Sequence, residues 1–141
     1  MTTTTKILRI ILIALTIFLA ITAIPGGVML VLNFFAPPVE QLHGSMFRDF
    51  TIPGLALALV VGGSALTSAI FLVRKSKFGA ILAAAAGFII IFFEFVEILV
   101  IGSPAGPSRV MQIGYFGLGT LIMVASFGIW FLELWTGKRS K

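Results

Sequence analysis

The chain of 141 residues contains no cysteine and a single histidine, His43. Without thiols it can form no disulfide bond, no thiolate metal site and no cysteine nucleophile. One histidine also excludes haem ligation by two histidines of the same chain. We therefore expect neither a bound metal nor a cofactor.

Charged residues are scarce, at 11% of the chain, whereas an ordinary soluble domain has about 25%. Apolar residues make up 59%, and the mean hydropathy is +1.15. Such a composition excludes a water-soluble fold. It predicts a single transmembrane domain covering residues 1–141, of the all-α class, because membrane-spanning helices account for long uncharged apolar runs.

Four apolar runs predict the spans of an integral membrane four-helix bundle, at residues 10–35, 52–73, 78–101 and 109–135. The sequence Pro25-Gly26-Gly27 predicts a kink in the first span. A cleaved signal peptide ending near Ala23 is the alternative for this region, although the apolar run resumes after the glycines. The polar segment 36–51 is expected to lie along the headgroups, with Thr51 as the N-cap of the second span.

Basic residues are distributed unequally between the two ends of the predicted spans. Arg48 and Arg109 fall on one side, and the other side has eight: Lys6, Arg9, Arg74, Lys75, Lys77, Lys138, Arg139 and Lys141. By the positive-inside rule both termini are expected in the cytoplasm, with the protein in a prokaryotic plasma membrane. We interpret the net charge of +5 as a topology signal and expect no nucleic-acid partner.

Small residues recur at four-residue intervals in two of the spans. The second span has Gly54, Ala58 and Gly62, and the third has Gly79, Ala83 and Gly87. Such stripes allow close contact between membrane helices. Because the two spans are antiparallel, we expect the stripes to face each other only in part. They either pack the four helices of one chain together or mediate association into a homo-oligomer or a larger membrane complex.

Glu94 and Glu97 are the only ionisable residues well inside an apolar run. An ionised side chain there costs about 2–3 kcal/mol on insertion scales, so such residues usually face the bundle and have a partner. Three positions apart, the two carboxyl groups lie on the same side of the helix. Arg109 and Gln112, at the start of the fourth span, are the nearest expected partners.

Three interpretations of this acidic pair remain open. The structural one has Glu94 protonated between helices and Glu97 paired with Arg109. The second is a proton or cation site, and the third is a site for a polar ligand such as a quinone or a lipid headgroup. We expect no catalytic residues and no enzymatic activity, since the sequence has neither a nucleotide-binding glycine loop nor a Ser-His-Asp set.

The entry to the second span contains Phe47-Arg48-Asp49-Phe50-Thr51-Ile52-Pro53-Gly54, and Val60-Val61-Gly62-Gly63-Ser64 follows it. This pattern resembles small, uncharacterised four-span membrane proteins of prokaryotes, which have an aromatic-x-Asp-aromatic-x-Ile-Pro-Gly entry to the second helix. The similarity extends over about residues 24–125. The resemblance implies the four-span architecture and no particular activity.

Three functions are compatible with these features. The first is a non-enzymatic subunit or accessory protein of a membrane assembly. The second is an oligomeric transporter or channel, coupled to protons or cations through Glu94 and Glu97. The third is a redox subunit of the membrane that binds a quinone or a lipid.

Overall fold

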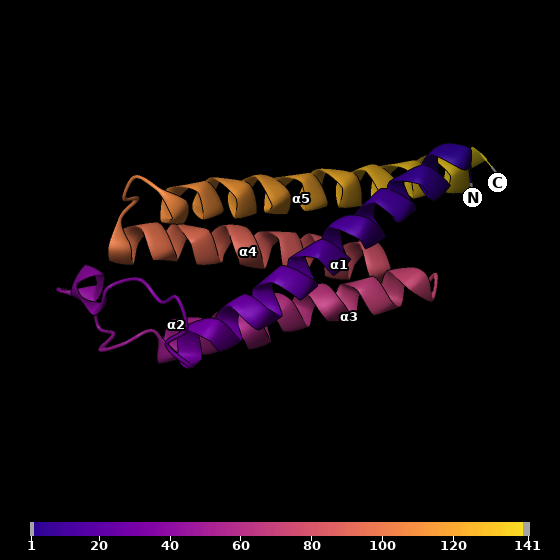
Figure 1. Cartoon of the computed structure of the whole chain (residues 1–141). Helices are drawn as coiled ribbons and strands as arrows, with labels where there is room; N and C mark the ends of the chain where they lie inside the picture. Colours follow the sequence, from indigo (N-terminus) through magenta and orange to yellow (C-terminus); the bar gives the residue numbers. More distant parts are fainter. Residues whose placement is uncertain (1, 140–141) are drawn as a thin grey trace.

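The structure is a computed structural model that describes residues 2–139. Within this range all regular structure is helical, and four helices are long and apolar enough to cross a membrane (Figure 1). The elements are α1 (Thr3–Val31), η1 (Val39–Leu42), α2 (Thr51–Leu55), η2 (Ala56–Val61), α3 (Gly62–Val73), α4 (Gly79–Ile101) and α5 (Pro107–Arg139). The predicted all-helical, multi-pass membrane fold is confirmed.

The first helix differs from its prediction at both ends. It begins at Thr3, where the Thr2 hydroxyl accepts a hydrogen bond of 3.2 Å from the Thr5 N–H, and it ends at Val31 rather than at residue 35. Asn33 and Phe35 have φ angles of 58° and 56°, in the left-handed region, which ends the helix. Pro25 lies inside the helix, and the bend expected there stays a prediction.

The second span is made of three successive elements, α2, η2 and α3. The middle one, η2, is π-helical, so its hydrogen bonds close wider turns than those of an α-helix. Hydropathy contains no signal for this change, and the sequence predicted a uniform helix. The wider turns alter which side chains of the span face its neighbours.

Thr51 is not the N-cap of the second span, contrary to the prediction: Phe50 occupies the N-cap position without a side-chain cap, and the Asp49 side chain before it binds the first helical residue. Thr51 is already helical, and its N–H donates to Asp49 Oδ1 at 2.9 Å. This hydrogen bond stabilises the ionised carboxyl group and holds the pKa of Asp49 below its ordinary value of 3.8. The short Asp49 side chain thus reaches forward to the first residue of the helix.

The Asp49 contact predicts a pH dependence of stability. Because the pKa is lower in the folded state, the stabilisation is complete above pH 3.8 and is lost as the pH falls through the folded value. Thermal unfolding in detergent should therefore show a midpoint that decreases less on acidification for Asp49→Asn than for the native chain. Identical pH profiles for the two proteins would contradict this role of Asp49.

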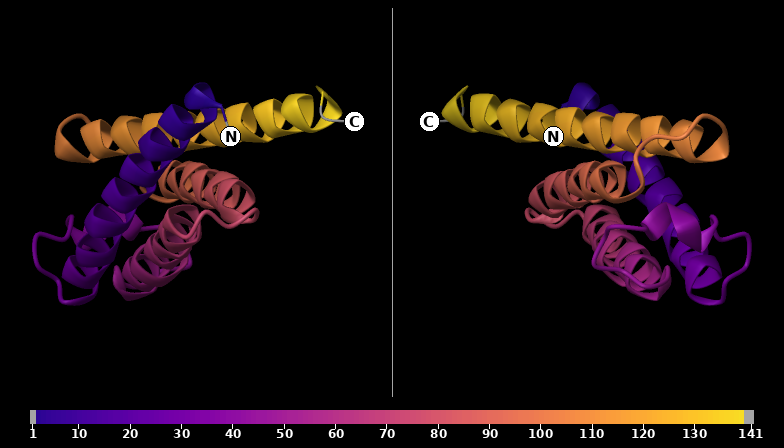
Figure 2. Two further views of the ribbon diagram at one scale, coloured as in Figure 1. Left: turned by 90° about the vertical axis from the view of Figure 1, so that its right-hand side faces the viewer. Right: turned by 90° about the vertical axis from the view of Figure 1, so that its left-hand side faces the viewer.

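The four spans form two antiparallel pairs that share a core. α4 and α5 lie side by side, and α1 crosses α5 near its own N-terminal end and packs along α3, η2 and α2 (Figures 1 and 2). The N- and C-terminal ends of the described chain lie at the same end of the bundle, as four crossings require (Figure 1). The cytoplasmic location of this end stays a prediction.

The small-residue stripe of the second span packs against α1. A Cβ atom added at Gly27 of α1 would lie 2.5 Å from the Ala58 backbone nitrogen, and one added at Gly54 would lie 2.7 Å from the Gly27 carbonyl oxygen. Gly62 is equally close to Ile24. The backbones of α1 and the second span therefore touch along Gly54, Ala58 and Gly62.

The stripe of the third span contacts other helices. A Cβ atom added at Gly87 would lie 2.8 Å from the Gly119 carbonyl oxygen of α5, and Gly79 faces Leu72 of α3. Ala83, between them, is fully buried in the core. The two predicted stripes are thus both used for packing within one chain: that of the second span packs on α1, and that of the third span contacts α5 and, at Gly79, α3.

An ion pair joins the helices at the end that contains the termini. Arg9 of α1 is 9% exposed, and its Nη2 lies 3.5 Å from Glu133 Oε1 of α5. Its Nη1 donates to the Leu72 carbonyl oxygen of α3, also at 3.5 Å. Arg9, which the sequence suggested only as a topology signal, therefore connects three helices.

Candidate ligand-binding cavity

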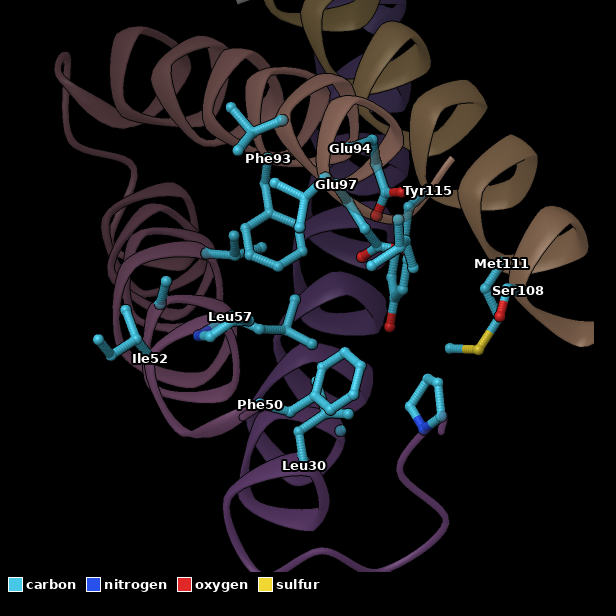
Figure 3. A pocket seen from close by; sticks show the side chains of 18 of the residues that line it. Leu30, Phe50, Ile52, Leu57, Phe93, Glu94, Glu97, Ser108, Met111 and Tyr115 are labelled. Atoms are coloured by element: carbon cyan, nitrogen blue, oxygen red, sulfur yellow. The ribbon is translucent and has the colours of Figure 1, made fainter. Parts of the chain in front are cut away.

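A cavity of about 540 Å³ occupies the half of the bundle remote from the chain termini (Figure 3). Its walls come from the end of α1, from α2 and η2, from the second half of α4 and from the start of α5. Most of the lining is apolar, and it includes six phenylalanines: Phe34, Phe35, Phe47, Phe50, Phe92 and Phe93. The volume and the apolar lining are typical of sites for small molecules.

The segment between α1 and α2 closes part of this cavity. We expected it to lie along the headgroups, with Met46, Phe47 and Phe50 as its apolar side. In the structure Phe47 and Phe50 line the cavity together with Leu42 of η1, and Met46 is 89% exposed. The segment therefore packs on the bundle through its apolar side chains instead of only resting on its surface.

Glu94 projects from α4 into the cavity (Figure 3). It is 2% exposed, and its Oε2 is buried without a hydrogen-bond partner. The expectation that this residue faces the bundle interior is confirmed. The structural interpretation expected Glu94 to form a hydrogen bond between helices, and its Oε2 forms none.

Glu97 lies one turn further along α4 and is held by Gln112 of α5. Gln112 Nε2 donates to Glu97 Oε1 at 3.1 Å and to the Gly102 carbonyl oxygen at 3.0 Å. Gln112 is 2% exposed, and its own Oε1 is buried without a partner. The predicted contact between Glu97 and Gln112 is therefore confirmed, and it fixes one Glu97 oxygen as an acceptor.

Arg109 does not pair with Glu97, contrary to the structural interpretation. Its side chain is exposed, and its guanidinium donates through Nε, at 3.1 Å, and through Nη2 to the Ser103 carbonyl oxygen. The turn between α4 and α5 brings this carbonyl within reach of a side chain that stays in polar surroundings. Glu97 is thereby left without a basic partner from α5.

Tyr115 is a member of the site that the sequence did not identify. A tyrosine near the end of a span commonly lies at the membrane interface, but Tyr115 is 9% exposed and lines the cavity beside the two carboxyl groups (Figure 3). It follows Gln112 by three residues, so both lie on the face of α5 that meets α4. This three-residue spacing from Gln112, a polar residue inside a span, was the sequence signal that could have identified Tyr115.

The polar groups of the cavity suit hydrogen bonding better than metal coordination. Among residues 2–139 no three His, Asp or Glu side chains are close enough to hold a metal ion, and His43 is exposed in the segment before α2. A carboxyl group accepts hydrogen bonds in both protonation states and also donates one when protonated. Glu94, Glu97 and Tyr115 could therefore bind the polar head of a largely apolar molecule.

No family model, curated protein or solved structure matches this chain. The resemblance to small four-span prokaryotic membrane proteins consequently stays a prediction.

Proposed function

We propose that this protein is a non-enzymatic integral membrane protein that binds an apolar molecule with a polar head. The observation that carries the proposal is the unpartnered Oε2 of Glu94, a residue in the wall of a largely apolar cavity. An unsatisfied polar atom in a buried position costs about 1–3 kcal/mol, so its presence needs an explanation. A ligand that supplies the missing partner is such an explanation.

The shape of the cavity supports entry from the bilayer. Val60 of η2 and Phe92 of α4 both line the cavity, yet they are 55% and 58% exposed. The lining of the cavity therefore includes side chains that also lie on the outer surface of two spans, which faces lipid when the helices span the membrane. The π-helical element in the cavity wall fits a binding role, since π-helical turns are frequent at functional sites.

Binding is favoured over conduction through a single chain. Every cavity-lining residue lies in the half of the bundle remote from the termini. The other half is filled by fully buried side chains, among them Leu12, Leu19, Ile122 and Ile129. A transporter or channel would need an oligomer or a rearrangement to continue the path.

The binding role is compatible with the first function expected from the sequence, a subunit or accessory protein of a plasma-membrane assembly. A quinone or a lipid is an occupant of suitable size and apolarity. Native mass spectrometry after gentle extraction tests partner, oligomer and retained ligand together. Recovery of a ligand-free monomer would contradict the subunit role.

Blocking the cavity is the direct test of the proposed function. Ala56→Phe places a large side chain in the lining, whereas Ala85→Phe adds the same group to an exposed position of α4 outside the lining. Organic extracts of the native chain and of Ala85→Phe should contain a retained apolar molecule with a polar head at about one molecule per chain, and extracts of Ala56→Phe should contain little. Equal amounts from all three proteins would overturn the proposal.

A further inference from the structure

We infer that the head of the ligand is an organic cation, and that its binding displaces a proton from the Glu94 and Glu97 pair. This inference rests on the proposed function, because it specifies the occupant of the same cavity.

The cavity contains acidic groups without a basic counterpart. No Lys, Arg or His is among the described residues that line the cavity, whereas Glu94 and Glu97 both line it. The nearest expected base, Arg109, donates to the Ser103 carbonyl oxygen, and Arg9 pairs with Glu133 at the opposite end of the bundle. A carboxylate in apolar surroundings is unfavourable without a counter-charge. Without a ligand the buried acids avoid this cost by staying protonated and neutral, and a positively charged ligand head is the partner that would allow one of them to ionise.

The hydrogen bonds of the pair leave room for a cation. Gln112 donates to one oxygen of Glu97, and this oxygen is already used as an acceptor. Glu94 Oε2 has no donor and is fully enclosed, since the residue is 2% exposed. A quinone carbonyl could accept a hydrogen bond from a protonated carboxyl group but has no positive charge to pair with a carboxylate. A cationic head adjacent to both groups would form an ion pair with one carboxylate while the other carboxyl group stays protonated.

The walls of the cavity match an organic cation better than a metal ion. Calcium takes about 6–8 oxygen ligands, and few oxygens are offered here. Phe93 precedes Glu94 in the lining, and Phe50 faces it across the cavity in Figure 3. The faces of aromatic rings attract alkylated ammonium and similar cations. A cation with an apolar body would contact these rings and the carboxyl groups at once.

Binding of such a cation would exchange it for a proton. The neutral carboxyl group loses its proton to water, and the resulting carboxylate forms an ion pair with the cation, so the charge of the cavity is unchanged. The titratable groups that face Glu94 are Glu97 on α4 and Tyr115 on α5, and the described lining of α1, α2, η2 and the preceding segment contributes none. Cation and proton therefore compete, and at most about one proton is released for each cation bound.

Tetraphenylphosphonium, a lipophilic cation without hydrogen-bond donors, is the probe, and triphenylphosphine oxide is its neutral counterpart. In zwitterionic nanodiscs the native chain should bind the cation at least about tenfold more tightly than the neutral compound. Its affinity should rise by up to about tenfold for each pH unit, and protons should appear in a weakly buffered solution. Cation binding with no pH dependence, or no preference for the cation, overturns the inference.

Variants assign the exchange to the acidic pair. Glu94→Gln should lose proton release and about tenfold or more in cation affinity, whereas Glu94→Asp, which keeps a carboxyl group, should retain proton release. Glu40→Gln makes the same charge change at an exposed position outside the lining and should behave like the native chain. Circular dichroism verifies that each variant folds. Unchanged proton release in a folded Glu94→Gln variant, or its loss in Glu94→Asp, would contradict the inference.

The two proposals fail in different ways. If the neutral compound binds as well as the cation and Ala56→Phe abolishes both, the cavity is a ligand site and only the cationic head is wrong. If neither compound binds to the native chain, or if Ala56→Phe changes nothing, the cavity is not a ligand site and both proposals fall.

Discussion

Gly119→Val is expected to destabilise the bundle by about 3 kcal/mol or to prevent its assembly, because the backbones of α4 and α5 touch at this residue. A Cβ atom added there would lie 2.7 Å from Ile90 Cγ2 and 2.8 Å from the Gly87 carbonyl oxygen. The Ile90 side chain is fully buried, and a backbone carbonyl cannot move without its helix. Overpacking of this kind typically costs about 1–3 kcal/mol, occasionally more.

Gly117→Val provides the matched control on the same helix. A Cβ atom added at Gly117 would have no neighbour within 4 Å. The substitution adds the same group to a surface-facing position, where glycine and valine differ by less than about 1 kcal/mol in helix propensity. The free energy of unfolding, measured by titration with a denaturing detergent, should fall for Gly119→Val and change little for Gly117→Val. Equal losses for both would contradict the close crossing at Gly119.

The sequence predicts the four helices well and their ends less well. Long uncharged runs have essentially one solution in a bilayer, since every backbone group must be hydrogen-bonded within its own segment. The ends depend on local contacts instead. The threonines before Lys6 join α1 through a cap that hydropathy does not register, and the left-handed conformation of Asn33 ends the helix before the apolar run is over.

The packing partners of the small residues could not be read from the sequence. The spacing of Gly54, Ala58 and Gly62 marks a flat face, but a flat face contains no information about which helix covers it. Gly27 contacts the stripe of the second span and Gly119 contacts that of the third, but neither residue belongs to a predicted stripe. Their importance follows only from the crossing points in three dimensions.

The residues of the candidate site could likewise be predicted from the sequence only in part. Glu94 and Glu97 were identified because a charge inside a span is rare, and Gln112 because it follows the connecting turn. The position of Arg109 and Tyr115 depends on how the turn and the face of α5 are oriented, which composition does not determine. The cavity itself combines residues from Gly26 to Tyr115, and the π-helical turn in its wall has no sequence signal.

Glu94→Leu is expected to increase the stability of the ligand-free protein by about 1–3 kcal/mol, while it abolishes cation binding. Leucine has a similar volume and no polar atom, so it removes the cost of the buried, unpartnered Oε2. A residue kept for ligand binding is commonly unfavourable for stability in this way. The free energy of unfolding in detergent, without added ligand, measures the effect.

Glu97→Leu should have the opposite sign, although the two acids are only three residues apart. Gln112 Nε2 would lose its acceptor on Glu97 and keep only the Gly102 carbonyl oxygen, inside a site where Gln112 is 2% exposed. We expect a loss of about 1 kcal/mol. If Glu94→Leu were destabilising as well, Glu94 would contribute a structural contact between helices. The unpartnered oxygen would then no longer be evidence for a ligand, and the binding function would lose the observation on which it depends.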